Sequence, residues 1–268
     1  VPADHLLIHV GGKEVTYGTL TAALAGTAAT QVQAQYCLVA NDCNGANIAN
    51  LSMSQQNSRW TATDVSNSSV SFNTVVDTTG KVSGGGYLNV GSYSFEHSDL
   101  RTTGTVNFNG VAINSGLLKV SPKTLTLSAN AVQKEYDGTA SLSDVVLTPS
   151  GALEGDAIGV SGGAGSLASK NAGTQGFTLS GLALQGADQA NYVLGSAQLS
   201  GTGTITPKAI TVSGLQAQDK VYDGSTQASV QTSGAVFNGI VAGDQLSVTA
   251  TGQFDTRHAG THKAVSLS

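Results

Sequence analysis

The chain has 268 residues, of which 11% are charged and 5% aromatic, with 34 glycines, 4 prolines and a net charge of −5. This charge disfavours a surface that binds nucleic acid or an anionic membrane, because such surfaces concentrate Lys and Arg. No apolar run approaches the roughly 18 residues needed to cross a bilayer, and no basic stretch followed by an apolar one opens the chain. We therefore expect no nucleic acid partner, no membrane insertion, and a mature or excised segment of a soluble protein.

Residues 1–121 are predicted to form a diverged, mostly-β first domain. The stretch LLIHVGGKEVTYGTL begins with a strand and carries a Tyr17-Gly18 step where the later repeats have Tyr-Asp-Gly. This domain is longer than the repeats that follow it. We expect its extra length, in residues 20–50 and 54–69, to form either one short helix plus a loop or an added hairpin.

Cys37 and Cys43 are the only cysteines, and they lie six residues apart in the turn-rich stretch QYCLVANDCNGAN. A local disulfide there would contribute about 2 kcal/mol in the chain-entropy model and would indicate an oxidising compartment. A reduced, buried pair is the main alternative. A metal site is a weaker one, because no second Cys pair or nearby His completes four ligands.

From Pro122 onward the sequence repeats with a period of about 85 residues. PKTLTLSANAVQKEYDGTASL, which starts at Pro122, matches PKAITVSGLQAQDKVYDGSTQ, which starts at Pro207. Two further matches follow in the same order, LEGD with VAGD and KNAGT with RHAGT. We therefore expect repeat 1 at 122–206 and repeat 2 at 207–268.

Within each repeat the apolar residues have the periodicity of strands. TLTLS alternates Leu125 and Leu127 with hydroxyl residues, and AITVS does the same with Ile210 and Val212. Turn residues at intervals of about 8 to 12 positions separate about seven short strands, which is typical of a β-sandwich. We predict an all-β fold of tandem immunoglobulin-like β-sandwich domains in an elongated array.

The repeated phrase Tyr-Asp-Gly is predicted to build a turn. Asp can accept a hydrogen bond from the N–H two residues on, Gly permits positive φ, and the Tyr ring can cover the core edge while its hydroxyl reaches backbone. A sugar-binding platform is the alternative. Enzyme sites are seldom duplicated along a repeat array, which favours the structural interpretation. The residues concerned are Tyr136, Asp137, Gly138, Tyr222, Asp223 and Gly224.

Taken together, these motifs resemble those of a known protein family. Units with Tyr-Asp-Gly after a PK-x-[LI]-T strand, then Gly-Asp, AGT, GADQANYVL and a terminal TGTITPK, resemble the YDG repeats of large bacterial surface adhesins. The first domain is similar to the glycine-containing, mostly-β repeats found beside them. The resemblance covers essentially the whole chain, strongly from Pro122. It implies a filamentous-haemagglutinin-like protein, exported by two-partner secretion to the cell surface or medium; this class includes biofilm-matrix adhesins that bind exopolysaccharide.

The sequence contains no cluster that indicates catalysis or a metal centre. His258 and His262 lie four residues apart, but on a strand they would be about 13 Å apart. The carboxylates of the repeats adjoin turns and form no D-x-D-x-D loop, which leaves calcium at the domain joints as a minor alternative. No G-x-S-x-G elbow with a placed His occurs. We expect no enzyme activity, no cofactor and no metal.

Two functions of different classes fit these features. The first is a monomeric, extracellular stalk whose Pro-Lys joints have no flexible linker, and which holds or extends a binding region in cell-cell or cell-matrix attachment. The second is a carbohydrate-binding module in which Trp60, Tyr87 and Tyr93 of the first domain stack on rings of exopolysaccharide or host glycan. The shortage of aromatic residues weighs against it. Partners would be a polysaccharide, another matrix component or a neighbouring adhesin.

Repeat 2 stops before any counterpart of GLALQGADQANYVLGSAQLSGTGTIT. A domain without those strands would expose apolar surface and an unpaired strand edge. We expect that the segment was cut or is disordered at its C-terminus, or that another chain completes the sheet.

Overall fold

The computed structural model describes residues 6–19, 31–37, 45–57, 59–64, 67–104, 111–143 and 145–268. These residues form strands joined by turns and two 3-10 turns, η1 (Gly45–Asn47) and η2 (Gln189–Asn191), with no α-helix among them. The all-β prediction is therefore confirmed, whereas the finer prediction of tandem immunoglobulin-like sandwiches stays a prediction. No helical segment in these ranges has the length and apolar character required to cross a membrane.

The chain folds as two compact units, each assembled from more than one stretch of sequence. Unit 1 comprises Val1–Ser128, Leu147–Gly162 and Gly181–Ala197, and unit 2 comprises Ala129–Val146, Gly163–Ser180 and Gln198–Ser268. Repeat 1 therefore contributes strands to both units, and repeat 2 lies in unit 2.

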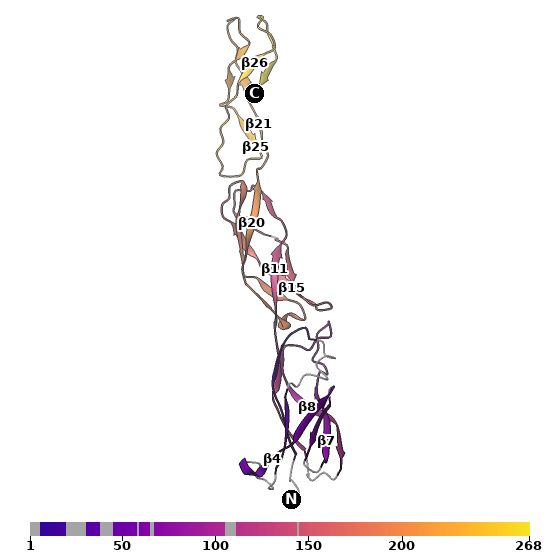
Figure 1. Ribbon diagram of the computed structural model, residues 1–268. Helices are drawn as coiled ribbons and strands as arrows, with labels where there is room; N and C mark the ends of the chain where they lie inside the picture. Colours follow the sequence, from indigo (N-terminus) through magenta and orange to yellow (C-terminus); the bar gives the residue numbers. More distant parts are fainter. Residues whose placement is uncertain are drawn as a thin grey trace. The chain divides into compact units, whose positions relative to one another are not determined.

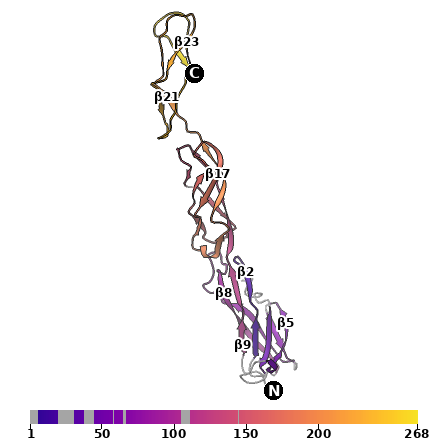
Figure 2. The ribbon, with the colours of Figure 1, turned by 90° about the vertical axis from the view of Figure 1, so that its left-hand side faces the viewer.

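The first domain contributes two sheets to unit 1. One has the strand order β4-β3-β1-β9 and the other β2-β10-β8-β7-β6-β5, in which β7 and β8 lie side by side (Figure 1). Figure 2 labels β2 and β5, the two edge strands of the six-stranded sheet. The strands are β1 (Leu6–Val10), β2 (Lys13–Thr16), β3 (Val32–Cys37), β4 (Ile48–Asn50), β5 (Ser52–Gln56), β6 (Arg59–Thr63), β7 (Ser69–Val76), β8 (Gly91–Thr103), β9 (Val111–Ser115) and β10 (Leu117–Ser121).

The core of the first domain follows from alternation along its strands. In β7 every second side chain is buried, and Phe72 at its centre is fully buried opposite Trp60 of β6. Leu6 and Ile8 of β1 are also fully buried, and each such side chain contributes about 1.5–3 kcal/mol. Strands β5 and β6 form a hairpin around Asn57, which has a φ of 56°. This is the added hairpin that the sequence offered as one alternative for residues 54–69.

Repeat 1 contributes to three sheets. The order β14-β11-β19 and the pair β15-β18 belong to unit 1, and the five-stranded order β12-β20-β17-β16-β13 belongs to unit 2. The strands are β11 (Lys123–Ala129), β12 (Val132–Glu135), β13 (Ser141–Leu142), β14 (Leu147–Ser150), β15 (Gly159–Ser161), β16 (Ala164–Leu167), β17 (Gly173–Ser180), β18 (Ala183–Gln185), β19 (Tyr192–Leu194) and β20 (Leu199–Thr206).

Repeat 2 forms shorter strands and buries far less. Its sheets are β21-β25, β22-β24 and β23-β26-β27. Ala228 is the one hydrophobic residue of 207–268, a range described throughout, that is buried, whereas Val221 is 89% and Tyr222 64% exposed. The strands are β21 (Thr211–Ser213), β22 (Gln216–Ala217), β23 (Gln227–Ala228), β24 (Val230–Gln231), β25 (Val236–Asn238), β26 (Gly252–Phe254) and β27 (Val265–Leu267).

One strand arrangement occurs in both the first domain and repeat 1. Strand β2 pairs in parallel with β10, the last strand before Pro122, and β12 pairs in parallel with β20, the last strand before Pro207. Directly after β2, the Tyr17 N–H donates to the carbonyl of Ser121, at 2.8 Å. Directly after β12, the Tyr136 N–H donates to the carbonyl of Thr206, at 2.9 Å. A tyrosine is therefore fixed beside each point where the chain enters the next repeat.

Candidate functional site

A carboxylate of repeat 1 binds the tyrosine that precedes the first joint. The Tyr17 hydroxyl donates to Asp156 Oδ2 at 2.5 Å, and the Tyr192 hydroxyl donates to the same oxygen at 2.6 Å. The backbone N–H of Gly85 donates to Asp156 Oδ1 at 3.0 Å. Hydrogen bonds to a charged acceptor are about twice as strong as neutral ones. Asp156 therefore connects two segments of the first domain to repeat 1, all within unit 1.

The protonation states at Asp156 favour this arrangement. Burial opposes ionisation of Asp156, but the hydrogen bonds from Tyr17 and Tyr192 outweigh it and lower the carboxyl pKa. Burial, and next the bond to Asp156, raises the pKa of Tyr17 above its ordinary value. The same two causes raise the pKa of Tyr192 to about 12. At neutral pH the carboxylate is charged and both phenols keep the proton that they donate.

Aromatic packing surrounds these hydrogen bonds. The Tyr17 ring is 2% exposed and meets Tyr192 edge-on, with ring centroids 5.2 Å apart. It meets Tyr87 in the same way, at 5.9 Å. Edge-to-face pairs of this kind are worth about 0.5–1.5 kcal/mol beyond the area that they bury. The Tyr192 hydroxyl also accepts the N–H of Leu153 at 2.9 Å, which holds the Gly-Asp turn against the ring.

The segment GADQANY of repeat 1 makes a second set of bonds to the first domain. Asn191 is buried; its side-chain oxygen accepts the N–H of Val90 at 2.8 Å, and its amide donates to the Asn89 side chain at 2.9 Å. Asp188 is also buried and accepts the N–H groups of Gly84 at 3.3 Å and Ala157 at 2.8 Å. The buried polar groups at this contact are thus satisfied across it.

The two facing loops approach backbone to backbone. A Cβ added at Gly85 would lie 2.6 Å from the carbonyl oxygen of Glu154, and one added at Gly155 would lie 2.8 Å from the Gly85 Cα. Only glycine allows an approach this close. The fit therefore depends on glycines from both sides of the joint.

The contact between repeats 1 and 2 uses the same residue types, within unit 2. The Tyr136 hydroxyl donates to Asp244 Oδ1 at 3.1 Å, and this bond raises the pKa of Tyr136. Asp244 belongs to VAGD, the counterpart of LEGD in repeat 1. An added Cβ on Gly138 would lie 2.9 Å from a Val241 methyl, at the aliphatic position three residues before the Asp.

A glycine and an aliphatic side chain meet in the same way at the first joint. An added Cβ on Gly18 would lie 3.0 Å from a methyl of Leu153, three residues before Asp156. We name the hydrogen bonds Tyr17–Asp156 and Tyr136–Asp244 the Tyr–Asp contacts. Each Tyr–Asp contact joins the tyrosine of the first domain or of repeat 1 to the Gly-Asp turn of the repeat that follows. The glycine near each tyrosine leaves room for the aliphatic side chain three residues before the Asp.

The Tyr-Asp-Gly turn has the same internal bonds in both repeats. Asp137 Oδ1 accepts the N–H of Thr139, two residues on, at 2.9 Å, and Lys134 lies 2.8 Å from its other oxygen. Hydrogen bonds from Lys134 and Thr139 lower the pKa of Asp137 to about 2. Gly138 has a φ of 81°. In repeat 2, Asp223, Gly224, Ser225 and Lys220 make the equivalent turn.

One feature of the motif was not foreseen from the sequence. The sequence predicts that the tyrosine hydroxyl reaches backbone, whereas Tyr136 and Tyr17 donate to carboxylates 108 and 139 residues away. The available signal was the Gly-Asp phrase, which recurs in the same order as Tyr-Asp-Gly. In repeat 2 the third tyrosine, Tyr222, is 64% exposed.

The remaining predicted site residues lie apart from this contact or only partly in it. Trp60 is 8% exposed in β6, and its buried ring nitrogen makes no hydrogen bond to the described residues. The Tyr93 hydroxyl donates to the carbonyl of Asn89 at 2.7 Å, and Tyr87 packs on Tyr17. A sugar platform of Trp60, Tyr87 and Tyr93 stays a prediction. The Cys37–Cys43 disulfide also stays one, because Cys43 lies outside the described residues.

Metal ligands do not gather in the part of the chain that the structure describes: no group of three or more His, Cys, Asp or Glu side chains there could hold an ion. Both oxygens of Asp156 and of Asp188 accept hydrogen bonds from protein groups. His258 and His262 instead line a cavity in repeat 2.

The fold and its repeated contacts define an all-β protein built from tandem units. A protein-family model for the YDG domain matches residues 121–200 and again 206–268. The chain therefore belongs to the YDG domain family. Neither the comparison with curated proteins nor that with solved structures finds a match.

Proposed function

We propose that this chain is a stalk segment of a bacterial surface adhesin. In this role it acts outside the cell, without catalysis, and holds or extends a binding region in attachment to other cells or to a biofilm matrix. The observation that carries the proposal is the recurrence of the Tyr–Asp contact. A hydrogen bond placed at the same point of the first domain and of repeat 1 serves to fix each of them to the repeat that follows.

The chemistry of the joints supports fixed rather than loose connections. Strands β10 and β11 are separated by Pro122 alone, so no flexible linker intervenes at the first joint. Backbone contact at Gly85 and Gly155, together with buried Asn191, adds shape and polar complementarity. A stalk needs such joints because flexible connections between its domains would not hold the binding region away from the cell surface.

We further propose that each complete repeat is an immunoglobulin-like β-sandwich. The proposal rests on the sequence of the repeat, in which turn residues at intervals of about 8 to 12 positions separate short strands, as in a β-sandwich. The proposal is consistent with the alternating burial of β17 and β20.

A matrix retention assay tests the functional proposal against the carbohydrate-binding alternative. The full chain and a known exopolysaccharide-binding domain are passed over immobilised matrix polysaccharide, alone and as a fusion. The stalk proposal predicts that the full chain alone is not retained and that the fusion binds as the domain does. Retention of the chain alone would contradict it and favour the alternative, in which case Tyr87→Ala and Tyr93→Ala would locate the site.

A further inference from the structure

The first two strands of the first domain, and of repeat 1, pair in parallel with its last two strands. In the first domain, β1 pairs with β9 over five residue pairs and β2 with β10 over four. In repeat 1, β11 pairs with β19 over three residue pairs and β12 with β20 over four. The other strand pairs whose register the structure describes are antiparallel. Among the described strands, parallel pairing therefore occurs only between those next to the two ends of the first domain or of repeat 1.

The direction of these strands determines how they respond to tension applied at the ends of the chain. Tension pulls the first strands toward their N-termini and the last strand toward its C-terminus. Two parallel neighbours are then sheared past each other, so the evenly spaced hydrogen bonds between them are loaded together. If the first and last strands were antiparallel, the two pulled ends would lie side by side, and the bonds would break one after another.

The point where tension enters each last strand carries an additional hydrogen bond. The Tyr17 N–H donates to the carbonyl of Ser121, the last residue of β10, and the Tyr136 N–H donates to that of Thr206, the last residue of β20. The next residue along the chain is in both cases the proline that begins the following repeat. Through the Tyr–Asp contacts the same tyrosines also hold that repeat. The loaded strand end is therefore bonded on both sides of the joint.

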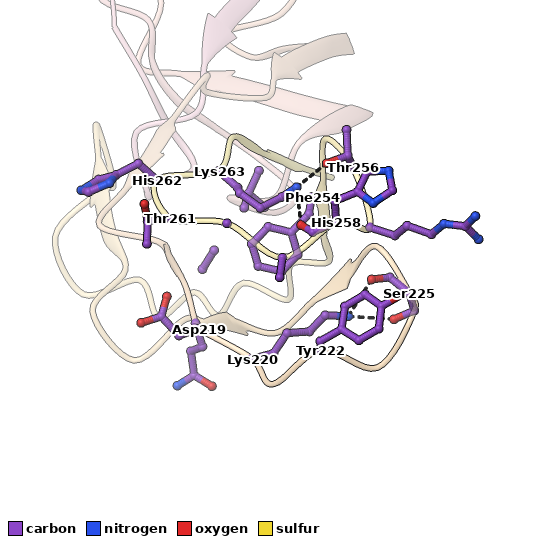
Figure 3. A pocket seen from close by; sticks show the side chains of 16 residues that line it. Asp219, Lys220, Tyr222, Ser225, Phe254, Thr256, His258, Thr261, His262 and Lys263 are labelled. Carbon is purple, nitrogen blue, oxygen red and sulfur yellow. Dashed lines mark hydrogen bonds between the residues drawn. The ribbon is translucent and has the colours of Figure 1, made fainter.

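A lysine anchors β12, which is an edge strand of its sheet. Lys134 of β12 donates to the carbonyl of Ser141 in β13 at 2.9 Å and lies 2.8 Å from a carboxylate oxygen of Asp137 in the Tyr-Asp-Gly turn. Figure 3 shows the corresponding lysine of repeat 2, Lys220, whose ammonium group donates to the carbonyl and the hydroxyl of Ser225. Strand β12 is therefore attached to its own unit by more than its bonds to β20.

We propose that the first domain and repeat 1 each contain a mechanical clamp that carries tension applied along the chain. The clamps are the parallel pairs β2–β10, within unit 1, and β12–β20, within unit 2. Their resistance comes from four residue pairs that are sheared together, extended at the loaded end by the tyrosine N–H bond. Load bearing goes beyond the proposed role as a stalk, and it follows from strand direction alone.

The first test pulls the folded full chain in two directions by single-molecule force spectroscopy. In one direction the handles are at the two ends of the chain. In the other they are at Ala131 and Thr202, exposed residues that lie directly before the pair Val132↔Gly203. The handles react with azide-bearing side chains introduced at these two positions, because the chain already has two cysteines. The chain that is pulled from its ends carries the same two azides, so the two directions compare proteins of equal stability.

Forced unfolding depends on the barrier that the load must cross and not on the equilibrium stability. Pulling from the ends shears β12 against β20, whereas pulling between Ala131 and Thr202 peels the pair apart bond by bond. We expect repeat 1 to break at a force about threefold higher in shear than in peeling, at the same loading rate. Unfolding events are assigned from the length of chain released, at roughly 3.5 Å per residue. Equal forces in the two directions, or a higher force in peeling, would overturn the proposal.

Two proline variants test the clamp of the first domain, where β2 is an edge strand. The Tyr17 N–H faces β10, and bonding residues alternate along a strand, so the Lys13 N–H faces β10 and the Glu14 N–H faces away. Lys13→Pro removes one bond of the clamp. Glu14→Pro is the matched control, because it removes none, although it deletes the side chain that accepts the Ser121 hydroxyl.

Lys13→Pro should lower the unfolding force of the first domain by about a quarter, as expected for the loss of one of about four bonds, and Glu14→Pro should change it little. Urea unfolding establishes that both variants are folded, and the comparison of pulling directions needs neither of them. Equal losses in the two variants, or no loss in Lys13→Pro, would contradict the clamp. Low forces in both pulling directions, together with rigid scattering by the full chain, would overturn the clamp and leave the stalk proposal standing.

Discussion

Replacing Asp156 with Asn should weaken unit 1 measurably, because this carboxylate accepts three hydrogen bonds at the first joint. An amide of the same shape keeps one acceptor oxygen, which can serve the N–H of Gly85, but presents an NH2 group to both Tyr17 and Tyr192. Tyrosine hydroxyls can also accept, so the loss is the difference between charge-assisted and neutral bonds. That difference is roughly 1 kcal/mol for each of two bonds, about 2 kcal/mol in all.

The assay is urea unfolding of the full chain, followed by Tyr and Trp fluorescence and by amide exchange at Gly85. Asp244→Asn is the matched control, because Asp244 accepts one tyrosine hydroxyl, at 3.1 Å, in a more open setting. We expect a clearly smaller loss there. Equal losses at the two positions, or no loss at Asp156, would refute the argument that the number and burial of the bonds determine the strength of the joint.

Three further predictions concern the same joint. The pKa values of Tyr17 and Tyr192 are raised in the folded state, to about 12 for Tyr192. Their contribution to the free energy of unfolding is therefore complete below the unfolded pKa of about 10 and is lost as pH rises through the folded pKa values. Unfolding titrations between pH 8 and 12 should show this loss, and Tyr17→Phe should reduce it. The pKa of Asp156 is lowered, so its contribution should be lost as pH falls below about 4, and an acid titration unchanged by Asp156→Asn would contradict this. Gly85→Ala should destabilise unit 1 by about 1–3 kcal/mol through its clash, whereas Gly176→Ala, where the nearest atom is 3.9 Å away, should change the urea midpoint little.

Local features of this chain could be predicted from its sequence because they depend on neighbouring residues. Asp137 and Gly138 are close in sequence to everything that they bind in the turn, and the preferences of Asp and Gly for such turns are general. The strand character of β11 followed from the alternation of Leu125 and Leu127 with hydroxyl residues. The Tyr17-Gly18 step was matched to Tyr-Asp-Gly in the same way, by comparing residues along the chain.

The Tyr–Asp contacts could not be predicted in this way, because their partners are separated by more than 100 residues. Only the repeated order of the two phrases hinted that they belong together. The burial of Trp60 had a clearer signal: in RWTAT it alternates with Arg59 and Thr61, as a core-facing residue does. Burial in repeat 2 could not be predicted either. Its apolar residues alternate as in a buried strand, but Val212 and Leu267 remain exposed in the structure.

The central claim is that the Tyr–Asp contacts fix the first domain to repeat 1, and repeat 1 to repeat 2, in a stalk. Small-angle scattering of the full chain tests it most directly. The proposal predicts a rigid particle with a maximum dimension of about 100 Å, the length of three β domains in series. It also predicts that the double variant Asp156→Asn with Asp244→Asn scatters as a more flexible chain. A compact particle, or a wild-type chain already as flexible as the double variant, would contradict the account.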